Sequence, residues 1–227
     1  MSPCLFDAVI FDFDGVLIDS EPLYLAATNA VFAREGRVLD ALTAAKYSGL
    51  RYPEMLAELI PLLGLSRDVD YYIRESRIEE ARVFGGQLEA VAGAATLMSQ
   101  LAERSVPCAV GSSSNHAWVD RVLRRLALRE SVSVVVGGDE VTAGKPHPEV
   151  FLRCVELLGV APSRCAVIED SVNGVLAACA AGMSPIGFPT YSGASLHLYE
   201  CFAIVSSLGQ VADVLNLIQA GGPSANG

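Results

Sequence analysis

The stretch Ala8-Val9-Ile10-Phe11-Asp12-Phe13-Asp14-Gly15 decides the fold that we expect for this chain. Its first four residues are apolar without alternation, which is typical of a parallel strand covered on both faces. The run ends at Asp12, and Asp14 follows two positions later, so the strand delivers two carboxylates to one edge. Gly15 then allows a sharp turn. The sequence predicts a central strand with acidic residues at its carboxyl end.

Three further apolar runs share this pattern, and each ends in small, polar or acidic residues. They are Val106 to Val110, Val132 to Val136 and Cys165 to Ile168. Segments of helical periodicity lie between or after them, namely Ala117 to Leu126, Pro148 to Leu158 and Val172 to Ala181. Strands that alternate with helices predict an α/β fold with an open, doubly wound, Rossmann-like parallel sheet. Such sheets bind ligands at the carboxyl ends of their strands.

A long insertion interrupts this alternation after the first strand. It spans about ninety residues, whereas a crossover needs only about a dozen. From Glu21 to Leu88 the pattern is helical, with glycine and proline punctuation and no convincing strand. We therefore expect a helical cap over residues 20–87 and a catalytic core over residues 1–19 and 88–219. Residues 220–227 contain nothing apolar enough to dock, and we expect a flexible tail there.

The composition excludes several functional classes. With a net charge of −10, the chain lacks the basic surface that nucleic acids or anionic membranes require. A hydrophobic fraction of 52% against 19% charged residues is too high for disorder. The sequence has no membrane-spanning run and no signal-peptide pattern at its start, so we expect a cytoplasmic protein. Its six scattered cysteines are expected to be buried free thiols, and the oligomeric state is not predicted.

A second acidic pair strengthens the functional interpretation. Glu169 and Asp170 end another apolar strand, so four carboxylates should converge on one edge together with Asp12 and Asp14. Like charges packed together are costly unless a cation neutralises them. Oxygen ligands without nearby histidine or cysteine favour Mg²⁺, which we expect as the cofactor.

A lysine and a serine loop add positive charge and hydrogen-bond donors. Lys145 is one of two lysines against fourteen arginines, and it lies between a strand and a helix. Its surroundings do not match a Walker A motif, because Pro146 follows it. The loop Ser112-Ser113-Ser114-Asn115 precedes a predicted helix. One of these residues should cap the helix, and the remaining hydroxyls, Ser112 and Ser113 in particular, are candidates for binding phosphate.

Taken in order, Asp12-x-Asp14-Gly15, Ser112, Lys145-Pro146 and Glu169-Asp170 resemble the four motifs of the haloacid dehalogenase-like superfamily. The inserted cap is similar to that of its phosphatase and β-phosphoglucomutase branch. The resemblance implies that Asp12 is the nucleophile and Asp14 the general acid and base.

The same resemblance assigns the remaining motif residues. It implies that Ser112 and Lys145 hold the phosphate, and that Asp12, Asp170 and the Asp14 backbone carbonyl bind Mg²⁺. Glu169 would lie beside the metal or reach it through water. A phosphate ester of a small metabolite, such as a sugar or sugar-acid phosphate, is the implied substrate.

The cap should choose the substrate, and four of its residues are candidates for contacting it. They are Arg51, Tyr52, Arg74 and Arg77, with the last two on one helical face. An intramolecular sugar-phosphate mutase is the main alternative to hydrolysis. Tyr52 stands where a mutase of this branch should carry a basic residue, which favours hydrolysis. A receiver-type signalling domain and a non-catalytic binding protein remain remote alternatives.

Overall fold

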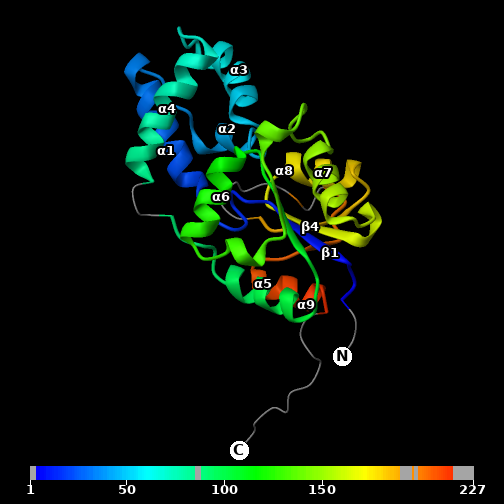
Figure 1. Ribbon diagram of the computed structural model, residues 1–227. Coiled ribbons are helices and arrows are strands. Elements are labelled where there is room, and N and C mark those ends of the chain that lie inside the picture. Colours follow the sequence, from blue (N-terminus) through cyan, green and yellow to red (C-terminus); the bar gives the residue numbers. More distant parts are fainter. Residues whose placement is uncertain (1–3, 85–87, 190–195, 197–198, 217–227) are drawn as a thin grey trace, which may run out of the picture.

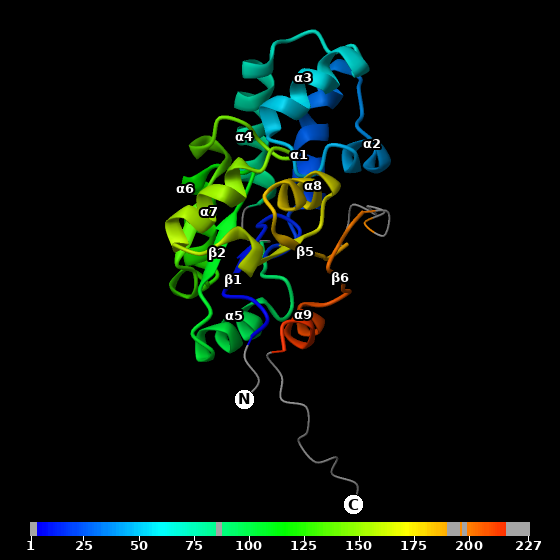
Figure 2. The ribbon, with the colours of Figure 1, turned by 90° about the vertical axis from the view of Figure 1, so that its right-hand side faces the viewer.

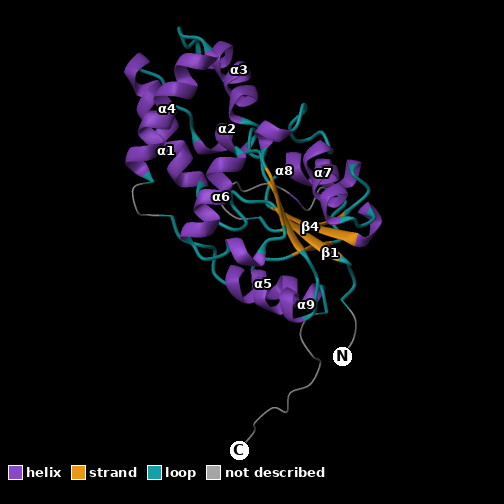
Figure 3. Cartoon of the chain, in the orientation of Figure 1, coloured by secondary structure: helices purple, strands orange, loops and turns teal. Residues whose placement is uncertain are grey.

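The computed structural model describes residues 4–84, 88–189, 196 and 199–216. Its centre is a parallel sheet in the order β3-β2-β1-β4-β5-β6, drawn in orange in Figure 3. The strands are β1 (Ala8–Phe11), β2 (Cys108–Gly111), β3 (Val134–Val136), β4 (Cys165–Glu169), β5 (Ser184–Gly187) and β6 (Ala203–Ile204). Phe11 lies opposite Ile168, so β1 and β4 end at the same edge.

The four predicted strands correspond to β1 to β4, and two of them begin later than predicted. β2 starts at Cys108 rather than at Val106, because the Val106 N–H donates to the Leu101 carbonyl and so closes the end of the preceding helix. β3 starts at Val134 rather than at Val132. β5 and β6 extend the sheet beyond the prediction.

Helices cover both faces of the sheet, which confirms the predicted doubly wound fold. The core helices are α5 (Ala94–Glu103), α6 (His116–Arg125), α7 (Glu149–Leu158), α8 (Val172–Ala180) and α9 (Leu208–Val214). Short 3-10 turns lie at Arg129–Ser131, Gly138–Glu140 and Pro162–Arg164. α5, α6 and α9 pack on one face, and α7 and α8 pack on the other.

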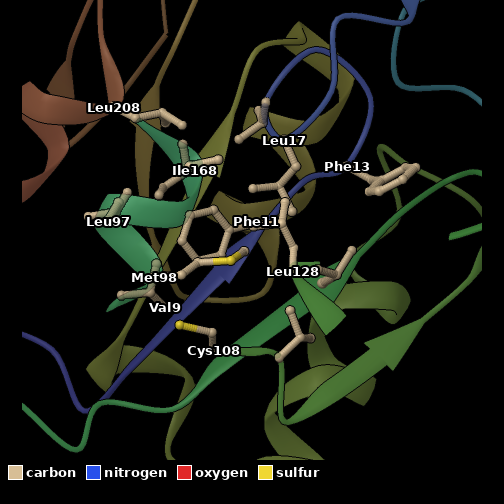
Figure 4. Packing of buried hydrophobic residues seen from close by; sticks show 14 of the residues in the cluster. Val9, Phe11, Phe13, Leu17, Leu97, Met98, Cys108, Leu128, Ile168 and Leu208 are labelled. Atoms are coloured by element: carbon tan, nitrogen blue, oxygen red, sulfur yellow. The ribbon is translucent and has the colours of Figure 1, made fainter. Parts of the chain in front are cut away.

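The buried central strand distributes its side chains between these two layers. Val9 and Phe11 belong to the hydrophobic cluster under α5 and α9, as Figure 4 shows. Ala8 and Ile10 belong to the cluster under α7 and α8. Because successive side chains of a strand point to opposite faces, an unbroken apolar run is what a doubly covered strand requires.

The insertion forms a helical layer with its own core. Its helices are α1 (Glu21–Phe32), α2 (Ala41–Ala45), α3 (Tyr52–Leu63) and α4 (Val69–Val83), with a 3-10 turn at Ala33–Glu35. Figures 1 and 2 show these helices together at one end of the molecule, above the sheet. Their shared hydrophobic cluster comprises Val31, Phe32, Leu39, Leu56, Leu59, Leu65 and Tyr72. The described residues 21–84 contain no strand, as predicted.

Some sequence expectations concern other parts of the chain. Residues 85–87, at the predicted cap boundary, and the predicted tail at 220–227 lie outside the described residues. None of the helices that the structure describes combines the length and apolar character needed to span a bilayer. All six cysteines are free, as predicted, although Cys179 is exposed.

Candidate active site

The carboxyl ends of β1 and β4 meet closely enough to bring their acidic residues together. Asp12 donates its backbone N–H to the Ile168 carbonyl at 2.9 Å. Gly15 turns the chain with a φ of 83°. A Cβ at that position would lie 2.1 Å from Asp170 Oδ2, so only glycine leaves room for the carboxylate.

Three carboxylates share one buried point. Asp12, Glu169 and Asp170 each offer an oxygen, and these oxygens lie within 4.8 Å of one another. All three residues are at most 6% exposed. Burying several negative charges is costly without compensating positive charge, so the cluster is suited to hold a cation.

Lys145 supplies part of that positive charge. Its Nζ donates to Asp12 Oδ1 and to Glu169 Oε1, each at 2.6 Å. The side chain is 1% exposed, and its Nζ lies 4.8 Å from the centre of the Phe151 ring. Burial alone would lower the pKa of Lys145, but the charges of Asp12 and Glu169 raise it. The side chain is therefore a fixed ammonium group.

Glu169 is held on both of its oxygens. Oε1 accepts from Lys145, and Oε2 accepts from the Ser171 N–H and hydroxyl at 2.9 Å each. A Cβ on Gly174 would lie 1.7 Å from Oε1, so the start of α8 packs directly on this carboxylate. Because both of its oxygens are bonded, Glu169 is held in place and fixes the position of the Lys145 ammonium group.

The ionisation of Asp12 depends on more than the lysine. Burial raises the pKa of Asp12, the Lys145 ammonium lowers it, and the neighbouring charges of Glu169 and Asp14 raise it again. A carboxylate that attacks phosphorus must be ionised. Additional positive charge beside Asp12 would favour that form.

Asp14 lies near this cluster, but its carboxylate accepts hydrogen bonds from other residues. Its Oδ1 accepts from the Ser20 hydroxyl at 2.6 Å, and its Oδ2 accepts from the Ser114 hydroxyl at 2.7 Å. Burial raises the pKa of Asp14, which suits a group that must hold a proton for part of a reaction. Thus three of the four predicted carboxylates share the buried point, and the fourth faces the cavity beside them.

The residues of the serine loop, Ser112 to Asn115, have different hydrogen-bond partners. Asn115 caps α6 by accepting the Trp118 N–H, which confirms that one residue of this loop caps the helix. Ser112 is buried, and its hydroxyl accepts the Ser114 N–H at 3.0 Å. Ser113 donates its hydroxyl to the Gly49 carbonyl of the cap at 2.5 Å, so this candidate phosphate ligand contacts the cap.

A cavity of about 930 Å³ opens between the cap and the core. Asp12, Asp14 and Asp170 lie in its lining, together with side chains of α1, α3, α4 and α6. A partly apolar cavity of this size fits a small organic molecule. The carboxylates therefore face a space that the cap roofs.

Hydrogen bonds of Ser113, Asn173 and Arg51 fasten the cap loop to the core. Besides the bond from Ser113, Asn173 Nδ2 donates to the Ser48 carbonyl at 2.8 Å. A Cβ on Gly49 would lie 2.4 Å from Ser171 Oγ, so this close approach of the cap loop to the core requires glycine. Arg51 Nη1 donates to the Val141 carbonyl at 3.2 Å.

The four cap candidates have different surroundings. Arg51 also bonds to the Gly138 and Thr142 carbonyls and pairs with Glu54, so its guanidinium is committed to joining cap and core. The Tyr52 hydroxyl bonds to Ser76 and Thr28, although its side chain lines the cavity. Arg77 lines the cavity. Arg74 is 63% exposed, pairs with Glu75 and is not among the lining residues that the structure describes.

Several cavity residues were not predicted from the sequence. Tyr24, Glu80 and Trp118 line the cavity from three different helices. None of them follows a strand or belongs to a motif. A weak signal existed, because Glu80 lies three residues after Arg77 and so on the same face of α4.

The fold and site define an α/β enzyme in which a helical cap encloses a buried carboxylate and lysine centre. A family model described as haloacid dehalogenase-like hydrolase matches residues 6–182. The chain belongs to this family and is a hydrolase of its phosphatase branch.

Named relatives and solved structures agree with this assignment. A phosphorylated carbohydrates phosphatase of Thermotoga maritima is 34% identical over 180 residues, covering 79% of this chain and 83% of the relative. Hexitol phosphatase B of Escherichia coli is 35% identical over 198 residues, covering 80% and 83%. The crystal structure of a putative β-phosphoglucomutase from Thermotoga maritima is 31% identical with a TM-score of 0.72, covering 93% of this chain and 99% of that one.

Proposed function

We propose that the protein is a Mg²⁺-dependent phosphatase that hydrolyses a small sugar or sugar-acid phosphate through an aspartyl-phosphate on Asp12. The observation that carries the proposal is the buried contact of Lys145 with Asp12 and Glu169 beside Asp170, facing a capped cavity. The names of two relatives, acting on phosphorylated carbohydrates and hexitol phosphates, support this substrate class.

The Asp12 and Asp170 carboxylates would hold the metal, with the Asp14 backbone carbonyl as a third protein ligand. Glu169 has both oxygens bonded to other groups, so it acts on the metal indirectly, through charge and through Lys145. When bound, Mg²⁺ supplies the positive charge that lets a phosphate dianion approach a carboxylate. The acidic, oxygen-only donor set fits this ion.

The reaction has two in-line steps. In the first, an Asp12 carboxylate oxygen attacks phosphorus, the bond from phosphorus to the ester oxygen breaks, and Asp14 gives its proton to the departing alcohol. In the second, Asp14 takes a proton from water as the water oxygen attacks phosphorus, and the bond to Asp12 breaks to release phosphate. Lys145 and the Ser112 loop stabilise the charge on the transferring oxygens.

The same proposal includes the organisation of the chain. The core would comprise residues 1–19 and 88–219, and the cap residues 20–87, which is supported by the separate hydrophobic cluster of the cap helices. Free cysteines support a cytoplasmic location.

A sugar-phosphate mutase is the second candidate, because a relative of known structure bears the name putative β-phosphoglucomutase. A mutase must bind a second phosphate in the cap. Arg51 is committed to Glu54 and to core carbonyls, which favours hydrolysis.

Mass spectrometry of rapidly quenched protein tests the proposal. With an aryl phosphate and Mg²⁺, we expect one phosphoryl group on the peptide that contains Asp12, and none in Asp12→Asn. Phosphate release and isomerisation, followed in parallel with sugar phosphates, separate hydrolase from mutase. Undiminished cleavage by Asp12→Asn would refute the proposed mechanism.

A further inference from the structure

One wall of the cavity is aromatic and crosses the junction between cap and core. The Tyr24 and Phe84 rings have centroids 4.9 Å apart, and the Phe84 and Trp118 rings 5.4 Å apart. The three residues belong to α1, the end of α4 and α6, which Figure 1 shows close together where the cap meets the core. All three line the cavity. Such a wall packs against the C–H groups of a ligand.

The Trp118 Nε1 atom of this wall is inaccessible to solvent, so an atom of a ligand in the cavity does not reach it. It acts instead on the neighbouring Tyr24 hydroxyl, whose pKa it lowers. The wall therefore offers a ligand aromatic surface, and polar contacts must come from the groups beside it.

Glu80 provides an acceptor next to the same wall. Its carboxylate accepts no hydrogen bond from any described residue, although it interacts electrostatically with Arg77 and Asp14. Asp14, Tyr24 and Glu80 all line the cavity, so the two acids and the aromatic wall border the same space. A ligand in this space would contact both Asp14, the proposed general acid, and Glu80 of the cap.

The charges around the wall disfavour a second anionic group. Apart from the catalytic carboxylates, the described lining contains the acids Glu21, Glu54, Glu80 and Asp139 and the arginines Arg51, Arg77 and Arg121. Arg51 pairs with Glu54, the charge of Arg77 interacts with that of Glu80, and Arg121 lies over the Trp118 ring at 5.0 Å. The acids outnumber the arginines even without the catalytic carboxylates, so the charge of the lining disfavours a second anionic group.

We infer that the wall receives an uncharged, polyhydroxylated alcohol, and that Glu80 is the specificity-determining residue that rejects substrates carrying a second anionic group. The inference rests on the proposed phosphatase function and narrows its substrate class. Hydroxyl groups donate to Glu80, and the carbon skeleton packs on the rings. A carboxylate or second phosphate in the same place would face Glu80 without a counterion.

The test compares a hexitol monophosphate with the phosphorylated hexonate of the same chain length, which carries a carboxylate in place of one terminal alcohol. With Mg²⁺ and the full-length wild-type chain, we expect kcat/KM for the hexitol ester to be at least about tenfold higher. A hexose bisphosphate should be rejected similarly.

Two variants test the residues. Glu80→Gln should reduce the preference at least about fivefold, since removing the charge lowers kcat/KM for the alcohol and raises it for the acid. Trp118→Ala removes an aromatic ring of the wall, and it should raise KM for the hexitol ester. Glu58→Gln makes the same charge change at an exposed cap position outside the described lining, and its preference should match the wild type.

Equal or absent cleavage of the matched pair by the wild type, or an unchanged preference in Glu80→Gln, would overturn this inference. A generic aryl phosphate distinguishes that failure from a failure of the proposed function. If the wild type cleaves the aryl ester through Asp12 without preferring the hexitol ester, only the specificity inference is wrong. If it cleaves no phosphate ester, both are wrong.

Discussion

Lys145 Nζ and Glu169 Oε1 lie 2.6 Å apart in a buried ion pair that joins the loop before α7 to the end of β4. Glu169 is bonded in turn to the backbone and hydroxyl of Ser171. The ammonium is therefore fixed before any substrate enters, and it also contacts Asp12. Preorganised charge of this kind stabilises a transition state without reorganisation during the reaction.

Replacing Lys145 by Arg should lower kcat by about 100-fold or more, because a planar fork cannot place one charge 2.6 Å from two carboxylates in a closed space. Steady-state hydrolysis of an aryl phosphate measures this. Lys46→Arg, on an exposed cap residue, is the control and should behave as the wild type. Full activity of Lys145→Arg would contradict a role in the reaction.

Asp14→Asn should separate the two steps of the reaction. An aryl phosphate has a good leaving group, so the first step needs little protonation, whereas water still needs a base in the second. We expect a burst of about one aryl alcohol per enzyme and then turnover reduced about 100-fold or more. Stopped-flow absorbance measures both phases, and normal steady-state turnover would exclude Asp14 as the acid and base.

Asp170→Ala should raise the Mg²⁺ concentration needed for half-maximal activity by about tenfold or more, since it removes one of the few carboxylates able to bind the ion. Titration of chelator-treated protein with Mg²⁺ measures the midpoint. Asp213→Ala, far along the chain on α9 and outside the described cavity lining, serves as the control. Identical midpoints for Asp170→Ala and wild type would remove this residue from the metal site.

Arg51→Lys tests the junction between cap and core. An ammonium group cannot reproduce the bonds that this guanidinium makes to Glu54 and to the carbonyls between Gly138 and Thr142. We expect kcat/KM to fall about tenfold because the closed cap becomes less favourable. Arg74→Lys makes the same change on an exposed cap helix and should have no such effect.

Much of the candidate active site could be predicted because its acidic residues end or follow strands. Buried parallel strands require unbroken apolar runs, and their carboxyl ends meet at one edge whatever the intervening sequence. Asp12 and Glu169 were therefore recognisable before their contacts were known, whereas Lys145, well beyond the end of β3, was recognisable by its rarity in the chain. β5 was not, since it is four residues long and contains Pro185, which argues against a strand. β6 has only two residues and carries almost no pattern.

The cap surface was much less predictable. Tyr24, Glu80 and Trp118 lie on ordinary amphipathic helices, and only the docking of the cap onto α6 brings them to one cavity. Helical spacing placed Arg74 and Arg77 together, yet the structure brings only Arg77 into the described lining. The two residues are about one helical turn apart, and the local sequence does not show which of them faces the cavity between cap and core.

Glu80, which we infer to select the substrate, also lowers the stability of the folded protein when its carboxyl group is ionised. Burial raises the pKa of Glu80 to about 6 from an ordinary 4.5, although Arg77 lowers it, and Asp14 raises it further. The charge of Glu80 in turn raises the pKa of the Tyr24 hydroxyl. Because the pKa is higher in the folded chain, the folded state binds more protons between these values. Ionised Glu80 therefore destabilises the fold above about pH 6, and the cost disappears as the pH falls below 4.5.

Glu80→Gln should consequently stabilise the protein in a pH-dependent manner. At about pH 7.5 we expect the free energy of unfolding to rise by about 2 kcal/mol, and at about pH 5 by less than half as much. Urea denaturation at both pH values measures the difference, with Glu58→Gln as the exposed control. A gain of equal size at both pH values would show that packing, and not the charge of Glu80, is responsible. Stability gained together with lost substrate preference is the combination expected of a residue retained for binding.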